Sequence, residues 1–425
     1  MSAPLIYNLF PTLAGDLWTW LAHAKRAQAM GFDWLYLNPI AQPGFSGSLY
    51  AVKDHYALNP QLVPPAVEKP LAELSRVIGQ IKEETGLRVM IDLVINHASK
   101  DAPLAKAHPN WFRHDEKGHL VSPSAIDPSD ARKVVVWGDL AEIDNANSAD
   151  RTGLWAYWTA LVQHYVDLGF DGFRCDAAYK VPAQLWTQLI AAARARRSDA
   201  LFVAETLGCR AAEVRALKAA NFDYLCNSSK WWQFDQPWCL DQHAEFGKIS
   251  PSVAFPESHD TARLAQETDG AVRVQKQRYA FAAAFSAGLL MPIGYEFCFR
   301  QRLDVVNTRP ADWEQGTTDI SGFITAINQL KRNTPVLALE GSWRALSSLD
   351  QPTLVLVKTG ADVQPVVLAI NKDWHASQRI NLPSFTEFFA DPPAIVRYNG
   401  SLSRQPLKRN SLALNPAEIA FIVAD

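Results

Sequence analysis

Short apolar runs alternate with amphipathic stretches along most of this chain. The runs have the length of strands, and the stretches between them carry apolar residues at helical spacing. The runs expected to form strands are Leu5–Phe10, Trp34–Leu37, Val89–Val94, Gly172–Cys175, Leu201–Ala204, Phe222–Leu225, Ser252–Phe255 and Leu289–Gly294. The stretches expected to form helices include Trp18–Met30, Pro70–Thr85, Leu154–Leu168 and Pro182–Arg196. Alternation of this kind predicts an α/β protein with a closed parallel (β/α)8 TIM barrel.

The spacing of the strands predicts one insertion in this barrel. The strand ends at Asp92 and Asp176 lie 84 residues apart, whereas one strand–helix unit takes about 30 residues. The region 98–149 between them is rich in Asp, Pro, His and Trp and poor in helical periodicity. We therefore expect the barrel to occupy 1–97 and 150–334, with a small loop-rich domain inserted at 98–149 after the third strand.

The pattern changes near Pro335. From there the chain has short β-rich runs separated by turns such as Thr359-Gly360 and Asn399-Gly400. The runs expected to form strands are Leu337–Leu339, Thr353–Val357, Val366–Ile370, Gln378–Leu382, Ala394–Tyr398 and Ile419–Val423. Region 335–425 is therefore predicted to be a C-terminal antiparallel β-sandwich.

Composition narrows the classes of partner and compartment. The chain is 48% apolar and 20% charged, as soluble globular proteins are, and its net charge of -3 suggests neither nucleic acid nor an anionic membrane as a partner. No apolar run approaches the length of a membrane span, and the first residues do not resemble a signal peptide. The five cysteines lack paired metal-ligand spacing. They are expected to be reduced thiols, and the protein is expected to be cytoplasmic.

Four apolar segments of the barrel pattern each lead to an acid. These acids are Asp92, Asp176, Glu205 and Asp260. The carboxyl ends of parallel barrel strands meet at one face, so the four acids are expected to share one site. An acid after a strand is also a common helix N-cap, which is the structural interpretation of any single one of them. Four of them in this order favour a site.

The neighbours of these acids suggest glycosidic chemistry. Two carboxylates facing one bond are the minimum for breaking a glycosidic linkage. Arg174 lies two residues before Asp176, so both point to the same side of a strand, and a guanidinium there keeps a nucleophilic carboxylate ionised. Glu205 ends an apolar strand, where burial would raise its pKa and suit it to donate a proton. His97 and His259 could donate hydrogen bonds to sugar hydroxyls.

The arrangement resembles the α-amylase family, glycoside hydrolase family 13, whose four signatures lie on barrel strands three, four, five and seven. The segments that carry the resemblance are Asp92–His97, Gly172–Asp176, Phe202–Glu205 and Phe255–Asp260. The family's inserted domain and C-terminal sandwich match the boundaries given above. Tyr50–Tyr56 resembles the family's loop in which a tyrosine stacks under the sugar being cleaved. Gly138–Asp144 resembles its fifth signature.

The resemblance implies a role for each site residue. Asp176 would be the nucleophile, Glu205 the general acid and base, and Asp260 the residue that stabilises the transition state. The residues that would contact substrate or support these three are Tyr50, Asp92, His97, Arg174, Lys180 and His259. Members of the family retain anomeric configuration, which implies carboxyl groups about 5–5.5 Å apart and a covalent glycosyl-enzyme intermediate.

The sequence departs from the family at one position that bears on metal binding. Many amylases have Lys-His shortly after the nucleophile, and that histidine helps to hold calcium; here the pair is Lys180-Val181. We expect no metal-ligating residues and no required cofactor, and a calcium site is in doubt. Lys180 remains available to a leaving-group sugar. Asn110–Arg113 and Val136–Ile143 also resemble the maltosyltransferases of the family.

The leading functional hypothesis is a retaining glycoside hydrolase that cleaves α-1,4 bonds in an α-glucan or maltooligosaccharide. The alternative is a transglycosylase or isomerase on the same site, because both share the covalent intermediate and differ only in the acceptor. A non-catalytic sugar-binding protein would be favoured by loss of an acid or of the arginine, and all are present. A metal-dependent barrel hydrolase would need paired ligands, and neither His97 nor His259 starts a His-x-His pair.

Overall fold

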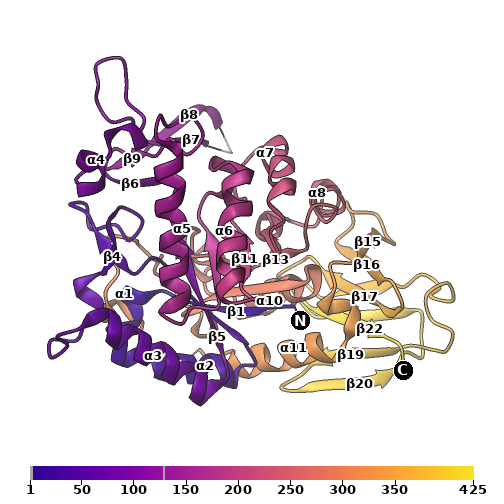
Figure 1. Cartoon of the computed structure of the whole chain (residues 1–425). Coiled ribbons are helices and arrows are strands. Elements are labelled where there is room, and N and C mark those ends of the chain that lie inside the picture. The colour runs from indigo at the N-terminus through magenta and orange to yellow at the C-terminus, as the bar shows by residue number, and fades with distance from the viewer. Residues whose placement is uncertain (1–2, 128–129, 317) are drawn as a thin grey trace.

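A closed parallel barrel of eight strands forms the centre of the protein (Figure 1). The computed structural model describes residues 3–127, 130–316 and 318–425. The barrel strands, in order around the barrel, are β1 (Leu5–Leu9), β2 (Trp34–Leu37), β5 (Arg88–Leu93), β10 (Gly172–Cys175), β11 (Leu201–Ala204), β12 (Tyr224–Cys226), β13 (Ser252–Ala254) and β14 (Gly288–Pro292). The pairing of β14 with β1 closes the ring. The predicted TIM barrel is confirmed.

Helices pack around the outside of this barrel. Those of at least eight residues in the described part of the barrel chain are α2 (Trp20–Ala29), α3 (Pro70–Thr85), α5 (Arg151–Asp167), α6 (Ala183–Arg196), α8 (Trp238–Phe246), α10 (Val272–Phe285) and α11 (Ser321–Asn333). Shorter ones are α1 (Pro11–Ala14), α7 (Ala211–Ala216), α9 (Leu264–Glu267) and the 3-10 turns η1 (Leu17–Thr19), η2 (Pro60–Leu62), η4 (Ala178–Lys180), η5 (Leu217–Ala220), η6 (Ser229–Trp231), η7 (Tyr295–Phe297) and η8 (Pro310–Asp312).

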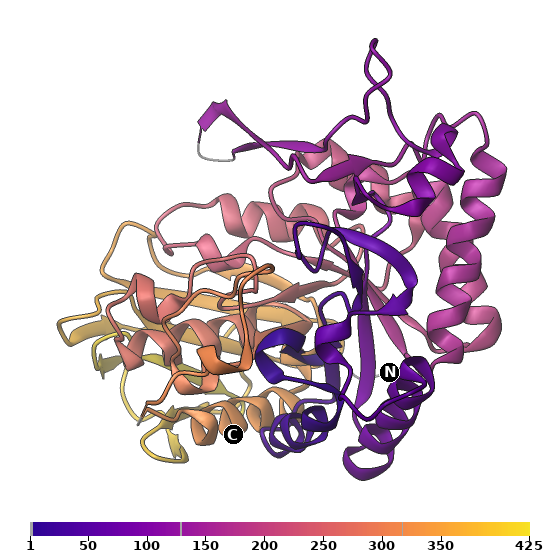
Figure 2. The same ribbon diagram turned by 90° about the vertical axis from the view of Figure 1, so that its left-hand side faces the viewer.

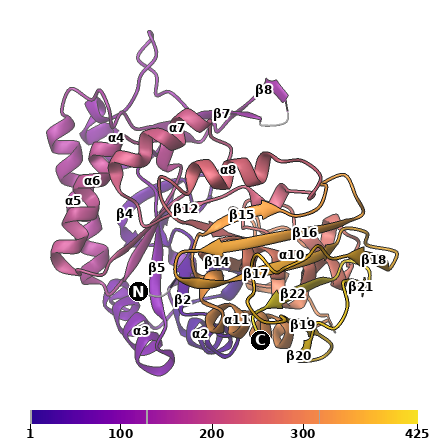
Figure 3. The same cartoon turned by 90° about the vertical axis from the view of Figure 1, so that its right-hand side faces the viewer.

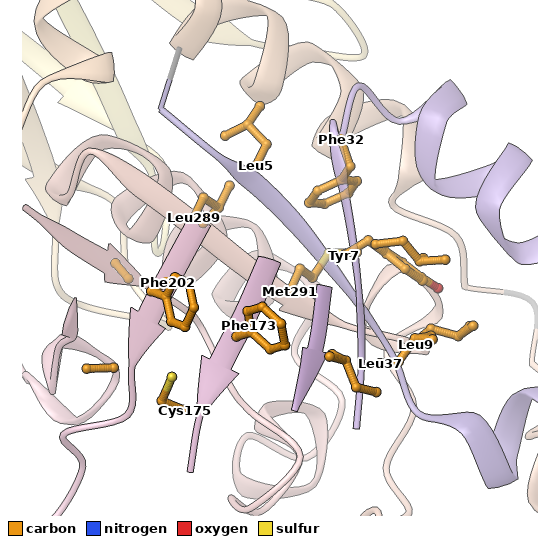
Figure 4. Packing of buried hydrophobic residues seen from close by; sticks show 14 of the residues in the cluster. Leu5, Tyr7, Leu9, Phe32, Leu37, Phe173, Cys175, Phe202, Leu289 and Met291 are labelled. Atoms are coloured by element: carbon orange, nitrogen blue, oxygen red, sulfur yellow. The ribbon is translucent and has the colours of Figure 1, made fainter. Parts of the chain in front are cut away.

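Successive side chains of each barrel strand point alternately outward and inward. Outward residues such as Tyr7, Phe173 and Phe202 belong to the large apolar cluster that includes the helices, and Figure 4 shows several of them packed together. Inward residues such as Trp34 and Met90 form a separate cluster inside the barrel. This period of two decides which side chains can reach the open end of the barrel.

Two loops at the carboxyl end of the barrel carry strands of their own. After β2 the chain forms the antiparallel pair β3 (Ala41–Pro43) and β4 (Val52–Leu58). After β5 it forms β6 (His97–Ser99), α4 (Pro103–Ala107), η3 (Pro109–Trp111), β7 (Ser124–Asp127), β8 (Asp130–Val136) and β9 (Leu140–Glu142). The β7–β8 hairpin extends away from the barrel in Figure 2. The domain limits at 98–149 and 335–425 stay a prediction.

The C-terminal region is an antiparallel sheet with a smaller sheet over one face (Figure 3). The six-stranded sheet has the order β15 (Ser342–Ala345), β16 (Thr353–Gly360), β17 (Val363–Asn371), β22 (Ile419–Val423), β19 (Ala394–Tyr398) and β20 (Leu402–Pro406), and the small sheet pairs β18 (Gln378–Asn381) with β21 (Ser411–Leu414). Leu354 and Leu356 face the barrel, whereas Val355 and Val357 face the small sheet. The predicted strand at Leu337–Leu339 was wrong: Pro335 starts a 3-10 turn there, η9 (Pro335–Ala338).

Two buried lysines, one of them from the C-terminal sheet, hold the end of α10. Lys358 of β16 donates from Nζ to the carbonyl oxygens of Ala284 and Phe285, at 2.8 and 3.3 Å. Lys331 of α11 donates to the carbonyls of Ala283, Ser286 and Leu337. The last carbonyls of a helix lack partners within the helix and carry partial negative charge. Burial lowers the pKa of both lysines, to about 7 for Lys358, and their amino groups cap the end of α10, the helix between β13 and β14.

We expect Gly172→Ala to destabilise the protein by about 1–3 kcal/mol, because overpacking strains a filled core. A Cβ at Gly172 would meet the Leu201 carbonyl oxygen at 2.7 Å and the Trp34 ring at 3.0 Å. Urea unfolding measures the change. Gly79→Ala in α3 is the control: a Cβ there meets nothing within 4 Å, and alanine should add about 0.5–1 kcal/mol of stability. Equal effects at both positions would contradict the packing argument.

Candidate active site

Inward-facing positions at the carboxyl ends of the strands bring the predicted site residues together. Arg174 lies directly opposite Asp92 in the register of β10 and β5. Asp176 follows β10 on the same side as Arg174, and Glu205 follows β11. Asp260 lies six residues after β13 ends at Ala254. Four segments that are far apart in the sequence thus converge on one end of the barrel.

The Arg174 guanidinium lies at the centre of this convergence. Its Nη1 lies 2.8 Å from Asp176 Oδ1 and 3.0 Å from both carboxylate oxygens of Asp92. Its Nη2 lies 3.7 Å from Glu205 Oε2 and 3.9 Å from Asp260 Oδ2. The side chain is only 5% exposed. Burial alone would lower the pKa of Arg174, but the surrounding acids raise it well above its usual value, so the group stays charged.

Asp176 is held by its strand and by Arg174. Its backbone N–H donates to the Leu93 carbonyl at 3.1 Å, and its carboxylate accepts the 2.8 Å hydrogen bond from Arg174. The next residue, Ala177, has left-handed backbone angles (φ 39°, ψ 49°), and its N–H donates to Glu205 Oε2 at 2.7 Å. A non-glycine residue in this region is strained. The hydrogen bond from Ala177 to Glu205 offsets this strain and ties Glu205 to the turn that follows Asp176.

Glu205 differs from Asp176 in its electrostatic surroundings. Burial raises its pKa most, and the carboxylates of Asp176 and Asp260 raise it further against the opposing effect of Arg174, to about 8. A carboxyl group with this pKa keeps its proton at neutral pH. The sequence-based expectation of a raised pKa at this position agrees with this value.

Asp260 remains ionised. Its side chain is 49% exposed, and His259 Nε2 lies 3.0 Å from its Oδ2. Desolvation would raise the pKa of Asp260, but His259, Arg174 and Arg302 together lower it to about 2. Arg302 also donates to the Asp260 backbone carbonyl at 2.8 Å. The site therefore combines a protonated Glu205 with an ionised Asp260 around a single cation.

A hydrogen-bond network fixes Asp92 beneath these groups. The hydroxyls of Tyr36 and Tyr50 each donate to Asp92 Oδ2 at 2.6 Å. Asn38 Nδ2 lies 3.0 Å from the Tyr50 hydroxyl. The Tyr50 ring is stacked on His259 with centroids 5.6 Å apart. With both carboxylate oxygens occupied, Asp92 acts on the arginine and is not placed to attack a substrate.

The other two predicted residues, His97 and Lys180, differ in burial and in contacts. His97 is buried, and its Nε2 lies 3.1 Å from the Tyr50 carbonyl oxygen, so it supports the tyrosine loop. Lys180 is exposed in η4, with Nζ 5.6 Å from the centre of the Tyr179 ring. Of the two tryptophans after β12, Trp232 is fully buried and Trp231 is 45% exposed.

Sequence reasoning missed Tyr36, Asn38, Ala177 and Arg302. Alternation along β2 would have found the first two, because Trp34, Tyr36 and Asn38 share its inward face. Ala177 gives no signal, since alanine rarely adopts a left-handed conformation. Arg302 lies in the loop after β14, where no motif marks it.

Comparisons with known proteins agree with this architecture. Residues 5–129 match the family model of the glycogen debranching enzyme glucanotransferase domain. An alpha-1,4-glucan:maltose-1-phosphate maltosyltransferase of Burkholderia pseudomallei is 27% identical over 87% of this chain and 33% of its own length, and that of Myxococcus xanthus is 27% identical over 83% and 55%. The alpha-amylase of Geobacillus thermoleovorans, solved with acarbose, superposes with a TM-score of 0.78 at 17% identity, covering 99% of this chain and 98% of that one.

The resemblance to the α-amylase family is confirmed. The fold is that of its amylases, and the resemblance to its maltosyltransferase branch extends over most of the chain. The chain spans about a third to a half of the length of the two maltosyltransferases.

Two findings bear on cofactors and membranes. Within residues 3–127, 130–316 and 318–425, no group of three or more His, Cys, Asp or Glu side chains is placed to hold a metal ion. No helix in the same part of the chain is long and apolar enough to cross a membrane. The expectations that no cofactor is required and that calcium is doubtful stay predictions.

Glu205 should make the stability of the protein fall as pH rises from about 4.5 to about 8. Its pKa is about 8 in the folded state against 4.5 as the ordinary value, so across this window the folded state binds one more proton than the unfolded state. The slope is on the order of 1 kcal/mol per pH unit. Glu205→Gln removes this ionisation, so the variant should gain stability relative to the native protein across the window.

Urea unfolding at a series of pH values measures this difference, with the exposed Glu116→Gln as the control for loss of a surface charge. A Glu205→Gln variant whose stability ran parallel to that of the native protein from pH 5 to 8 would contradict the raised pKa.

Proposed function

We propose that this chain is a retaining enzyme acting on α-1,4-linked glucans, with Asp176 as nucleophile, Glu205 as general acid and base, and Asp260 as stabiliser of the transition state. The observation that carries the proposal is the position of one buried guanidinium. Arg174 lies 2.8, 3.7 and 3.9 Å from the carboxylates of these three residues. Two carboxyl groups beside one bond, one of them able to donate a proton, are the requirement of retaining glycosidic chemistry.

In the first step, Asp176 attacks the anomeric carbon and forms a carbon–oxygen bond to it. The glycosidic bond breaks at the same carbon, and Glu205 gives its proton to the departing oxygen. The pKa of about 8 keeps that proton available at neutral pH. Arg174 orients Asp176 by its 2.8 Å hydrogen bond.

In the second step, the ionised Glu205 takes a proton from an incoming hydroxyl group. That oxygen bonds to the anomeric carbon, and the bond to Asp176 breaks, which restores both carboxyl groups. Asp260, with a pKa of about 2, supplies negative charge beside the oxocarbenium-like transition state of each step. His259 and Tyr50 then position the sugar, His97 supports the loop that carries Tyr50, and Lys180 contacts the leaving group.

The acceptor in the second step separates two reactions. Water as acceptor gives hydrolysis, and the 49% exposure of the Asp260 side chain supports access of water to the site. A glucan hydroxyl as acceptor gives transfer, which is supported by the maltosyltransferases that align with most of this chain. We propose hydrolysis of maltooligosaccharides as the leading reaction and transfer from maltose 1-phosphate to a glucan as the second candidate. The cytoplasmic location proposed from the reduced cysteines suits either substrate.

A covalent trapping experiment tests the assigned roles. Glu205→Gln cannot protonate a sugar leaving group, so its turnover of maltoheptaose should fall by about 10²–10⁴-fold. With α-maltosyl fluoride, whose leaving group needs no acid, the same variant should accumulate a glycosyl-enzyme that intact-protein mass spectrometry detects.

Asp176→Asn should lose turnover and form no adduct, because it lacks the nucleophile. Glu116→Gln, an exposed glutamate, serves as the control and should behave as the native protein. An adduct on Asp176→Asn, or full activity of that variant, would refute the assignment of the nucleophile.

Product analysis separates hydrolysis from transfer. The native chain is incubated with maltooligosaccharides alone and, separately, with maltose 1-phosphate and a glucan acceptor, and products are resolved by chromatography. Hydrolysis predicts shorter maltooligosaccharides in the first reaction, and only free maltose and phosphate in the second. Glucans lengthened by maltosyl units would reverse the order of the two candidates.

A further inference from the structure

A cavity of about 220 Å³ lies between the barrel and the C-terminal sheet, outside the candidate active site. Its walls come from α10, α11, β19, β20 and the turn that leads into β22. Figure 3 shows α10 and α11 beside β19 and β22 in this part of the molecule. None of the catalytic or substrate-binding residues assigned above lines it.

Two cations on one face of α10 border this cavity. Arg273 and Lys276 are three residues apart, so they lie on neighbouring turns of the helix. Neither forms an ion pair within residues 3–127, 130–316 and 318–425. The acid in the lining, Glu418, is engaged by Arg397 through two hydrogen bonds of 2.6 Å. The cavity therefore carries an excess of positive charge, which favours an anion.

The remaining walls of the cavity include two aromatic rings. Lys276 Nζ lies 5.6 and 5.4 Å from the ring centres of Phe323 and Tyr398, which keeps the ammonium beside the cavity. Gln277, also in the lining, is 2% exposed, and its Nε2 donates to the Asn371 carbonyl at 2.6 Å, which joins α10 to β17.

The volume of the cavity and the chemistry of its lining together indicate the class of ligand. About 220 Å³ is the volume of roughly seven waters, enough for one hexose but not for a maltodextrin chain. Guanidinium and ammonium groups recognise phosphate oxygens, and an aromatic ring suits the apolar face of a pyranose. We propose that this cavity binds a compact phosphorylated sugar, with its phosphate between Arg273 and Lys276.

Such a ligand would contact three elements of the fold at once. Arg273 and Lys276 belong to α10, Phe323 to α11 and Tyr398 to β19. A ligand that binds only the folded state stabilises it. Binding should therefore raise the thermal midpoint of the protein by an amount that grows with the logarithm of ligand concentration above the dissociation constant. This readout does not depend on the proposed catalytic reaction.

The test is calorimetric titration of the full chain with glucose 6-phosphate, glucose and inorganic phosphate, supported by thermal melts. Glucose 6-phosphate should bind, and glucose or phosphate alone should bind at least about tenfold more weakly, because each lacks one group of contacts. In Arg273→Ala/Lys276→Ala the affinity for glucose 6-phosphate should fall at least about tenfold.

The control is Lys408→Ala/Arg409→Ala, which removes two exposed cations elsewhere in the C-terminal region and should bind as the native chain does. Lys276→Met keeps the packing of the stem on the two rings, so it tests the charge even if the double variant is poorly folded. Absence of binding to the native chain, unchanged affinity in the double variant and in Lys276→Met, or equal affinity for phosphate and glucose 6-phosphate would each overturn the proposal.

Discussion

The buried guanidinium of Arg174 is the constraint on which the site depends. Its charge must be balanced, because an unpaired cation inside a barrel is costly. Asp92, opposite it in the register, and Asp176 both lie within 3.0 Å of its Nη1. Asp260 adds a further negative charge at 3.9 Å. At Glu205, burial and then the carboxylates of Asp176 and Asp260 outweigh the opposing effect of Arg174, so this fourth acid keeps its proton, with a pKa of about 8.

The acids differ in role because their surroundings differ, more than because of their residue types. Asp92 has both oxygens occupied by two tyrosine hydroxyls and the arginine, so it serves as an anchor. Asp176 is oriented by the same guanidinium. The strained turn at Ala177 adds a backbone donor that ties Glu205 to the strand carrying Asp176. Displacement of one of these side chains would therefore change the protonation or the orientation of the others.

The C-terminal sheet supports this arrangement from the outside. It buries one face against the barrel, and its Lys358, together with Lys331 of α11, caps the end of α10. That helix links β13, which leads to Asp260, with β14, which leads to Arg302. The same helix carries the two cations of the proposed sugar-phosphate cavity, so ligand binding there and the support of the barrel involve one element.

The sequence by itself determined the barrel, its strand order and the grouping of the acids, because alternation with a period of two and the spacing of strand ends are local properties. It also indicated that Glu205 follows an apolar strand. It could not place Ala177, whose backbone angles depend on the packed turn, or Arg302, which reaches Asp260 from a loop after another strand. The strand predicted at Leu337–Leu339 was wrong because Pro335 starts a 3-10 turn there. Only the tertiary structure decided how four carboxyl groups share one guanidinium. The sharing depends on distances between segments that are far apart in the sequence, such as those of Asp92 and Arg174, which are 82 residues apart.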